Sequence, residues 1–183
     1  MAKVKGSAIV ASVRFLRRNK DAAREALPPT LHHYLSKRVL EASWYPEEDM
    51  VPLVRAAARV LGEPERPFYE KAGRFSAQMH ADGVYRHLVR EGESESMARR
   101  ALVLWSTQHD TGAMEMQATG NGQVRVVLRG FERPSREACL INGGYLAATF
   151  EISGYKDVQV EKQGCCLDGD PECGWTVSWS SKG

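Results

Sequence analysis

The sequence predicts an α+β fold in which a helical N-terminal half packs on a C-terminal antiparallel sheet with the order ββαββ. Three observations predict this fold. Apolar residues recur at helical spacing up to residue 107. Two alternating segments then flank Asn121-Gly122, a dipeptide typical of tight β-hairpin turns. A further helical segment separates this hairpin from two more alternating segments.

Five helices are predicted in the N-terminal half. The first 20 residues contain six basic and no acidic side chains, and their apolar residues lie near helical spacing, which indicates an amphipathic opening helix. Prolines and Gly62 separate the other helices, because the residue before a proline is disfavoured in helical backbone. The predicted helices after the opening one span residues 30–42, 50–61, 67–90 and 96–107.

Four strands and one helix are predicted in the C-terminal half. Residues 114–119 and 123–131 form the hairpin, and residues 156–161 and 174–180 alternate in the manner of half-buried strands. The helix spans residues 135–153 and contains Gly143-Gly144. Because each glycine disfavours a helix by about 1 kcal/mol relative to alanine, we expect close packing of this backbone against a neighbouring element.

The composition is that of an ordinary globular chain. The 183 residues include 25 Lys+Arg and 23 Asp+Glu, and the net charge of +2 is too small to favour a nucleic acid partner. A chain of this length buries roughly 70% of its surface on folding, so we expect one domain over residues 1–183. The basic face of the opening helix is interpreted as solvated, with a membrane surface or an anionic partner as the alternative.

The chain contains no apolar run long enough for a transmembrane segment. Arginines also interrupt the apolar stretch near the start, so no signal peptide is predicted. Only four residues are cysteines, far fewer than in disulfide-rich scaffolds. These observations predict a cytoplasmic protein with reduced thiols.

The four cysteines all lie in the C-terminal half. Cys139 falls in the predicted helix, whereas Cys165, Cys166 and Cys173 fall in the turn between the last two strands. Zinc prefers four thiolate or nitrogen ligands in a tetrahedron, and a helix packed on the sheet could bring a third thiol to the turn. Cys139, Cys165 and Cys173 are therefore metal-ligand candidates. The alternative is a set of reduced thiols without a metal.

The junction between the helices and the sheet is the candidate ligand site. Several aromatic and apolar side chains lie on segments that could line a cavity there, and one histidine ends the helical half just before the sheet. The other four histidines are expected at the surface or the edge of the core. No nucleophile elbow, phosphate loop or dinucleotide fingerprint is present, so no enzymatic activity is predicted. The pocket candidates are Phe75, Met79, Tyr85, Trp105 and His109.

Residues 139–183 combine spaced cysteines, a Gly-Asp-Pro turn and two tryptophans. The residues of this motif are Cys139, Tyr145, Cys165, Gly169, Asp170, Pro171, Cys173, Trp175 and Trp179. The pattern resembles the 4-vinyl reductase domain, the small-ligand-binding module of phenol-sensing bacterial transcription activators, which is related to TRAPP trafficking subunits. The resemblance implies a zinc ion held by three cysteines and one glutamate. The glutamate position falls on Lys162, so Glu161, Cys166 or water would supply the fourth ligand.

Short motifs in the N-terminal half resemble a second family, which belongs to the same superfamily as the 4-vinyl reductase domain. They are Val4-Lys5-Gly6, Trp44-Tyr45-Pro46 and residues 53–62 and 68–73. These motifs are similar to those of the haem nitric-oxide-binding domain, and the combination of both halves also resembles paralogous families of myxobacteria. The Tyr-x-Ser-x-Arg anion clamp of the haem domain falls on Arg129, Phe131 and Arg133, so only its arginine is kept. His109 is the nearest candidate for the iron ligand but lacks the flanking pattern of that histidine, so we do not expect haem.

The predicted function is a non-enzymatic sensor or regulatory module. It would bind a small apolar or aromatic ligand and signal through protein contacts, as a homodimer and with a possible structural zinc site. The alternative is a TRAPP-like dimeric scaffold without a ligand. A haem gas sensor and a tetrapyrrole vinyl reductase are further alternatives, but a reductase needs a hydride donor and no nucleotide or flavin motif is present.

Overall fold

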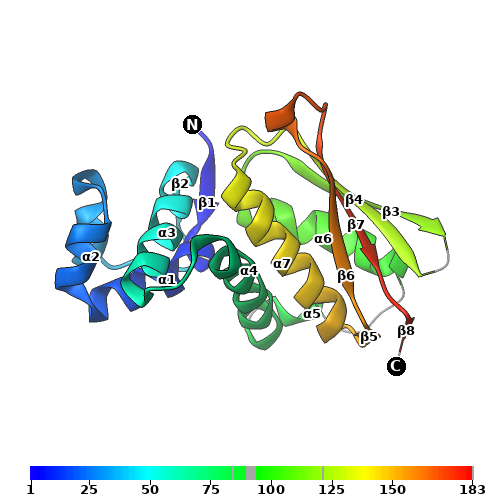
Figure 1. Ribbon diagram of the computed structural model, residues 1–183, viewed down its shortest axis with the longest axis horizontal. Coiled ribbons are helices and arrows are strands. Elements are labelled where there is room, and N and C mark those ends of the chain that lie inside the picture. The colour runs from blue at the N-terminus through cyan, green and yellow to red at the C-terminus, as the bar shows by residue number, and fades with distance from the viewer. Residues whose placement is uncertain (84, 90–93, 121, 183) are drawn as a thin grey trace.

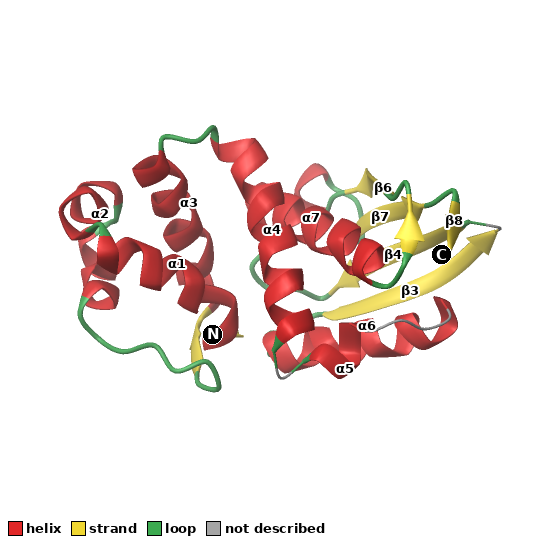
Figure 2. Ribbon diagram, turned by 90° about the horizontal axis from the view of Figure 1, so that it is seen from below, coloured by secondary structure: helices red, strands yellow, loops and turns green. Residues whose placement is uncertain are grey.

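The structure is a computed structural model that describes residues 1–83, 85–89, 94–120 and 122–182. Helices α1 to α3 gather at one end of the molecule, the main sheet lies at the other end, and α4 stands between them (Figure 2). Each end has its own cluster of buried apolar side chains. The predicted combination of helices and an antiparallel sheet is confirmed.

The N-terminal end is built from three helices and a small sheet. Strand β1 (Lys3–Lys5) pairs with β2 (Trp44–Pro46), and the helices are α1 (Gly6–Arg18), α2 (Lys20–Ala26) and α3 (Met50–Leu61). Short 3-10 helices cover Pro29–Leu35 and Glu47–Asp49. The apolar stripe of α1 is buried as predicted, with Ile9 and Leu16 fully inaccessible.

The helix predicted over residues 30–42 is wrong. Only the 3-10 helix Pro29–Leu35 forms, and the following segment runs without regular structure to β2. The physical reason is the start of α1, whose first amides have no partner within their own helix. The amide of Gly6 donates to the Ser43 carbonyl oxygen (2.9 Å) and that of Ser7 donates to the Glu41 carbonyl oxygen (3.1 Å). These contacts hold the segment along α1.

The long helix predicted over residues 67–90 is also divided. Helix α4 (Glu65–Asp82) ends at Gly83, and the short helix α5 (Arg86–Val89) follows. Residue 90 lies outside the described residues. Helix α6 (Ser94–Gln108) leads into the sheet and agrees with the predicted helix to within two residues.

The main sheet has the strand order β3-β4-β7-β6, and all neighbours are antiparallel (Figure 1). Helix α7 (Arg136–Ile152) connects its two halves, and a separate pair of short strands lies beside it. Asn121 of the predicted hairpin turn lies outside the described residues, but β3 and β4 pair up to Gly120 and Gln123. The strands are β3 (Ala113–Gly120), β4 (Gln123–Arg129), β5 (Tyr155–Lys156), β6 (Gln159–Gly164), β7 (Cys173–Ser178) and β8 (Ser181–Lys182).

One face of the main sheet forms the second core. Val126 and Trp175 are register partners on this face and are almost inaccessible, and α7 packs over them through Leu146 and Phe150. No helix in the described part of the chain is long and apolar enough to cross a membrane.

Helices α4 and α7 touch at the level of their backbones. A Cβ atom at Gly144 would lie 2.1 Å from the Glu70 carbonyl oxygen, and one at Gly73 would lie 1.9 Å from the Ile141 carbonyl oxygen. The expected close packing is therefore confirmed for Gly144. It is wrong for Gly143, where the nearest atom to an added Cβ would be Trp175 Nε1 at 3.8 Å.

Candidate ligand cavity and thiol cluster

A cavity of about 450 Å³ lies between the two cores. Helices α1, α3 and α4 form one side of its wall, and α6, α7 and β3 form the other. Its volume falls within the range of roughly 300–1,000 Å³ that is usual for small-molecule sites. Most of the wall is apolar, as the lining residues Phe15, Val54, Leu104, Met116 and Leu146 illustrate.

Three of the five predicted pocket residues line this cavity: Phe75, Trp105 and His109. Met79 does not line it and is 42% exposed, because it lies on another face of α4. Tyr85 also stands outside the lining and packs edge-on against the ring of His80, with 5.1 Å between the ring centroids. A role in ligand binding stays a prediction for all five.

His109 is held on three sides. Its Nδ1 donates to Glu47 Oε2 (2.9 Å), and its ring stacks on Trp105 with 4.0 Å between the centroids. Phe131 meets the same ring edge-on at 5.6 Å. Glu47 is only 3% exposed, and its Oε1 has no hydrogen-bond partner within the described residues. Sequence reasoning missed Glu47, which comes from the short 3-10 helix before α3.

His80 is a second cavity-lining histidine that the sequence did not single out. It is 7% exposed, and its Nδ1 lies 2.8 Å from the hydroxyl oxygen of Tyr145 on α7. Burial, aided by the nearby His109, lowers the pKa of His80 to about 4. The ring is therefore neutral at pH 7 and can accept a hydrogen bond or a metal ion through a ring nitrogen.

His80 belongs to a stripe of residues along one face of α4, some of them small, and this spacing was the signal in the sequence. Tyr69, Gly73, Ala77 and His80 follow each other at spacings of four, four and three, and all are buried. The larger apolar residues on α4 drew attention to a different side, since small side chains carry little hydrophobic signal. Close packing against α7 requires those small residues.

The three anion-clamp positions do not form a clamp in this structure. Phe131 lines the cavity. Arg129 is paired with Glu172 (2.5 Å), and Arg133 is paired with Glu48 (2.9 Å). Among the described lining residues the cation is Lys71, whose Nζ lies 2.5 Å from a carboxylate oxygen of Glu63.

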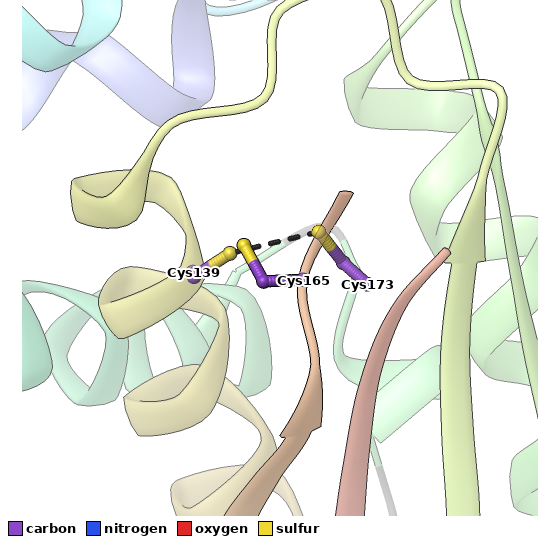
Figure 3. A group of neighbouring side chains, drawn as sticks. All are labelled: Cys139, Cys165 and Cys173. Carbon is purple, nitrogen blue, oxygen red and sulfur yellow. Dashed lines mark hydrogen bonds between the residues drawn. The ribbon is translucent and has the colours of Figure 1, made fainter. Parts of the chain in front are cut away.

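The three predicted metal-ligand candidates come together at one end of α7 (Figure 3). Cys139 projects from the first turns of α7, Cys165 follows β6 and Cys173 begins β7. Their Sγ atoms all lie within 4.8 Å of one another, and Cys139 Sγ is 3.8 Å from Cys173 Sγ. The Sγ of Cys166 lies 3.3 Å from Cys173 Sγ. All four are free thiols.

Cys173 is the acceptor at the centre of this thiol cluster, which consists of Cys139, Cys165, Cys166 and Cys173. Burial raises the pKa of the Cys173 thiol, but hydrogen bonds from Cys166 and Cys139 and the charge of Lys162 outweigh burial, so its pKa lies below the usual value. Burial raises the pKa of Cys139 to about 12 and that of Cys166 to about 11. Cys173 is therefore the first of these three to become a thiolate.

The residues proposed for the fourth ligand differ in their placement. Lys162 lies with its ammonium 4.0 Å from the centroid of the Trp175 ring, on the inner side of the sheet. Glu161 is exposed and pairs with Thr176, and alternation along β6 directs it to the other side. Cys166 is the nearer candidate.

Comparison with solved structures identifies proteins that share this fold. An H-NOX protein from S. oneidensis in the Fe(II)NO ligation state has a TM-score of 0.66 at 15% identity, covering 97% of this chain and 99% of that one. An unliganded Fe(II) mutant of an H-NOX protein from K. algicida has a TM-score of 0.68 at 10% identity, covering 97% of each chain.

An oxygen-binding H-NOX domain related to soluble guanylate cyclases, solved as its oxygen complex, has a TM-score of 0.66 at 9% identity. That match covers 97% of this chain and 96% of that one. No protein-family model and no curated protein matches the sequence. The likeness to haem nitric-oxide-binding domains is thus borne out for the fold, while the likeness to 4-vinyl reductase and TRAPP proteins stays a prediction.

Proposed function

We propose that this chain is a non-enzymatic sensor or regulatory domain that binds a small molecule in its central cavity. The observation that carries the proposal is the apolar cavity of about 450 Å³ between the two cores, with a few polar groups in its wall. Ligand-binding proteins of the same fold support it. Signalling through protein contacts and a homodimeric state belong to the same proposal, and light scattering with and without ligand tests the dimer.

Haem is the first ligand to test, because the structural neighbours include H-NOX proteins described in Fe(II)NO and oxygen-bound states. This support runs against the expectation from sequence that haem is absent. The cavity wall fits haem in two respects. His80 and His109 offer imidazole nitrogens for the iron, and Lys71 offers a cation for a carboxylate. Haem iron, when bound, supplies a coordination position for a diatomic gas.

Titration with haem tests this occupant directly. We expect a Soret band that saturates at one haem per chain and moves when NO is added to the reduced protein. Substituting His80→Ala and His109→Ala separately should change the spectrum in at least one case, whereas His87→Ala on α5 serves as a control outside the cavity. A wild-type spectrum equal to that of free haem would exclude haem as the ligand.

An apolar ligand without a metal is the second candidate. It is favoured by the shortage of cations in the cavity wall. Haem has two carboxylates, whereas the cation in the described lining is Lys71, which is already paired with Glu63. The neutral fluorescent probe N-phenyl-1-naphthylamine tests this candidate. We expect saturable binding that weakens when Ala11→Trp fills the cavity. Binding that is equal in both proteins would place the probe elsewhere.

We also propose that the thiol cluster binds a structural zinc ion, with Cys166 as the fourth ligand. At a Zn–S distance of about 2.3 Å, the sulfurs of a tetrahedral site stand about 3.8 Å apart. Cys139 and Cys173 have that separation. The charge of Lys162 offsets part of the negative charge of the thiolates. Elemental analysis should find one zinc per chain in wild type and less in Cys165→Ser and Cys166→Ser. The assignment would be contradicted if purified wild-type protein held no metal and was as stable as the same protein with added zinc.

A further inference from the structure

A second hollow of about 680 Å³ lies between α4, α7 and β6. It shares no lining residue with the central cavity, because the two use different faces of α7. Ile141 and Tyr145 face the cavity, whereas Leu140 and Gly143 face this cleft. Cys139 and Cys165 of the thiol cluster border one end of the cleft. The cleft is thus separate from the ligand site proposed above.

Gly143 lies at the floor of the cleft, and no close packing contact explains why a glycine stands there. It lies in the middle of α7, where glycine is disfavoured relative to alanine. Its neighbour Gly144 is needed for the contact with α4, but a Cβ at Gly143 would meet nothing closer than Trp175 Nε1 at 3.8 Å. The missing side chain therefore exposes the indole N–H of Trp175 to the cleft.

The indole N–H of Trp175 opens into the cleft and has no protein acceptor among the described residues. Trp175 is 1% exposed, yet it lines the cleft. Among the described residues no acceptor lies within hydrogen-bond distance of its Nε1, and the ammonium of Lys162 lies over its ring. An indole N–H can only donate a hydrogen bond, so its partner must be an acceptor. An acceptor atom brought by a ligand would provide one here.

The side chains around the cleft favour an anion. Four of them are cationic and two are acidic, so the cleft has an excess of positive charge. Arg74 and Arg136 are paired with Glu151 and Asp168, but Arg66 and Lys162 have no carboxylate within 4.0 Å in the described part of the chain. The charged lining residues are Arg66, Arg74, Arg136, Lys162, Glu70 and Asp168.

We propose that this cleft binds a small anion through phosphate or carboxylate oxygens, one of which accepts the hydrogen bond of Trp175 Nε1. Lys162 and Arg66 supply the cationic surroundings, and Gly143 supplies the space. Phosphate and carboxylate share the required chemistry, which is an anionic oxygen that accepts an N–H. The proposal does not depend on the ligand of the central cavity.

Calorimetric titration of the full chain with inorganic phosphate, and separately with acetate, tests the proposal at constant ionic strength. We expect saturable binding of at least one anion to wild type. Gly143→Ala, which covers the indole N–H, and Trp175→Phe, which removes it, should each raise the Kd at least tenfold. Lys37→Ala, an exposed cation at the far N-terminal end, should leave the Kd unchanged.

The melting temperature of each variant shows whether a loss of anion binding results from misfolding. Gly143→Ala should melt at or above the wild-type temperature, because alanine favours the helix and has room. A stable Gly143→Ala protein that has lost anion binding would establish the cleft as the site. Saturable binding that is unchanged in both Gly143→Ala and Trp175→Phe, or no saturable binding of either anion to wild type, would overturn the proposal.

Discussion

The contact between α4 and α7 predicts opposite effects for alanine at two adjacent glycines. At Gly144, an added Cβ would lie 2.1 Å from the Glu70 carbonyl oxygen, whereas ordinary contact begins at 3.4 Å. The difference is 3.4 − 2.1 = 1.3 Å, and because the obstacle is backbone, the two helices must separate by about that distance. At Gly143 the same change meets only an ordinary contact of 3.8 Å.

The size of each effect follows from two opposing terms. Overpacking of a dense interior costs about 3 kcal/mol when the obstacle cannot move aside. Alanine recovers about 1 kcal/mol of helix propensity, so Gly144→Ala should lose about 2 kcal/mol. For a chain of this size, that loss lowers the melting temperature by roughly 4–8 °C. Gly143→Ala has the propensity gain alone and should raise the melting temperature by roughly 2–4 °C.

Circular dichroism melts and urea unfolding of the two variants measure these effects. Because the substitutions are identical and adjacent, changes in the unfolded state are nearly the same in both. The comparison therefore isolates the helix contact. A Gly144→Ala protein that melts at or above wild type would show that the helices are not in backbone contact. Equal destabilisation by both variants would refute the assignment of Gly143 to an open cleft.

Three further predictions concern a helix cap, a titration and a metal. Ser135 caps α7 by accepting a hydrogen bond from the Ala138 amide (3.0 Å), so Ser135→Ala should lose about 1 kcal/mol in urea unfolding. The folded-state pKa of His80, about 4, lies below its unfolded value of 6.5, so protonation favours unfolding. Wild type should therefore lose roughly 3 kcal/mol more than His80→Gln between pH 6.5 and 4, measured by urea unfolding at each pH. A chelator should lower the melting temperature of zinc-loaded wild type and leave Cys165→Ser unaffected, and equal shifts in both would argue against the zinc site.

Local signals predicted much of the fold. The helix expected over residues 50–61 agrees with α3 (Met50–Leu61), because Gly62 marks its end and its apolar stripe is regular. The strands flanking the hairpin turn were also predicted from local signals, namely their alternating side chains and the Asn-Gly dipeptide between them. The segment after Leu35 could not be predicted, since its irregular path depends on amides at the start of α1, about 36 residues earlier in the chain.

The candidate sites differ in the same way, because some of their features are local in the sequence and others depend on distant contacts. The thiol cluster was visible in the sequence because Cys165 and Cys173 share one turn, although Cys139 required the packing of α7 on the sheet. The partners of the two cavity histidines were not visible. His80 meets Tyr145 from 65 positions away, and His109 meets Glu47 from 62 positions away. Such pairs depend on how the two ends of the molecule close around the cavity, which local periodicity does not encode.

Helix α7 links all the candidate sites, and its position is fixed by backbone contact. Tyr145 faces the central cavity, Gly143 faces the cleft, and Cys139 belongs to the thiol cluster. At Gly144 no side chain separates α7 from α4, so rotamer changes cannot absorb a movement of either helix. A ligand that shifts α7 from within the cavity must therefore also move the floor of the cleft and one thiol. Gly144→Ala, by forcing the helices apart, should weaken binding at the cavity and at the cleft together, whereas Gly143→Ala should weaken binding at the cleft alone.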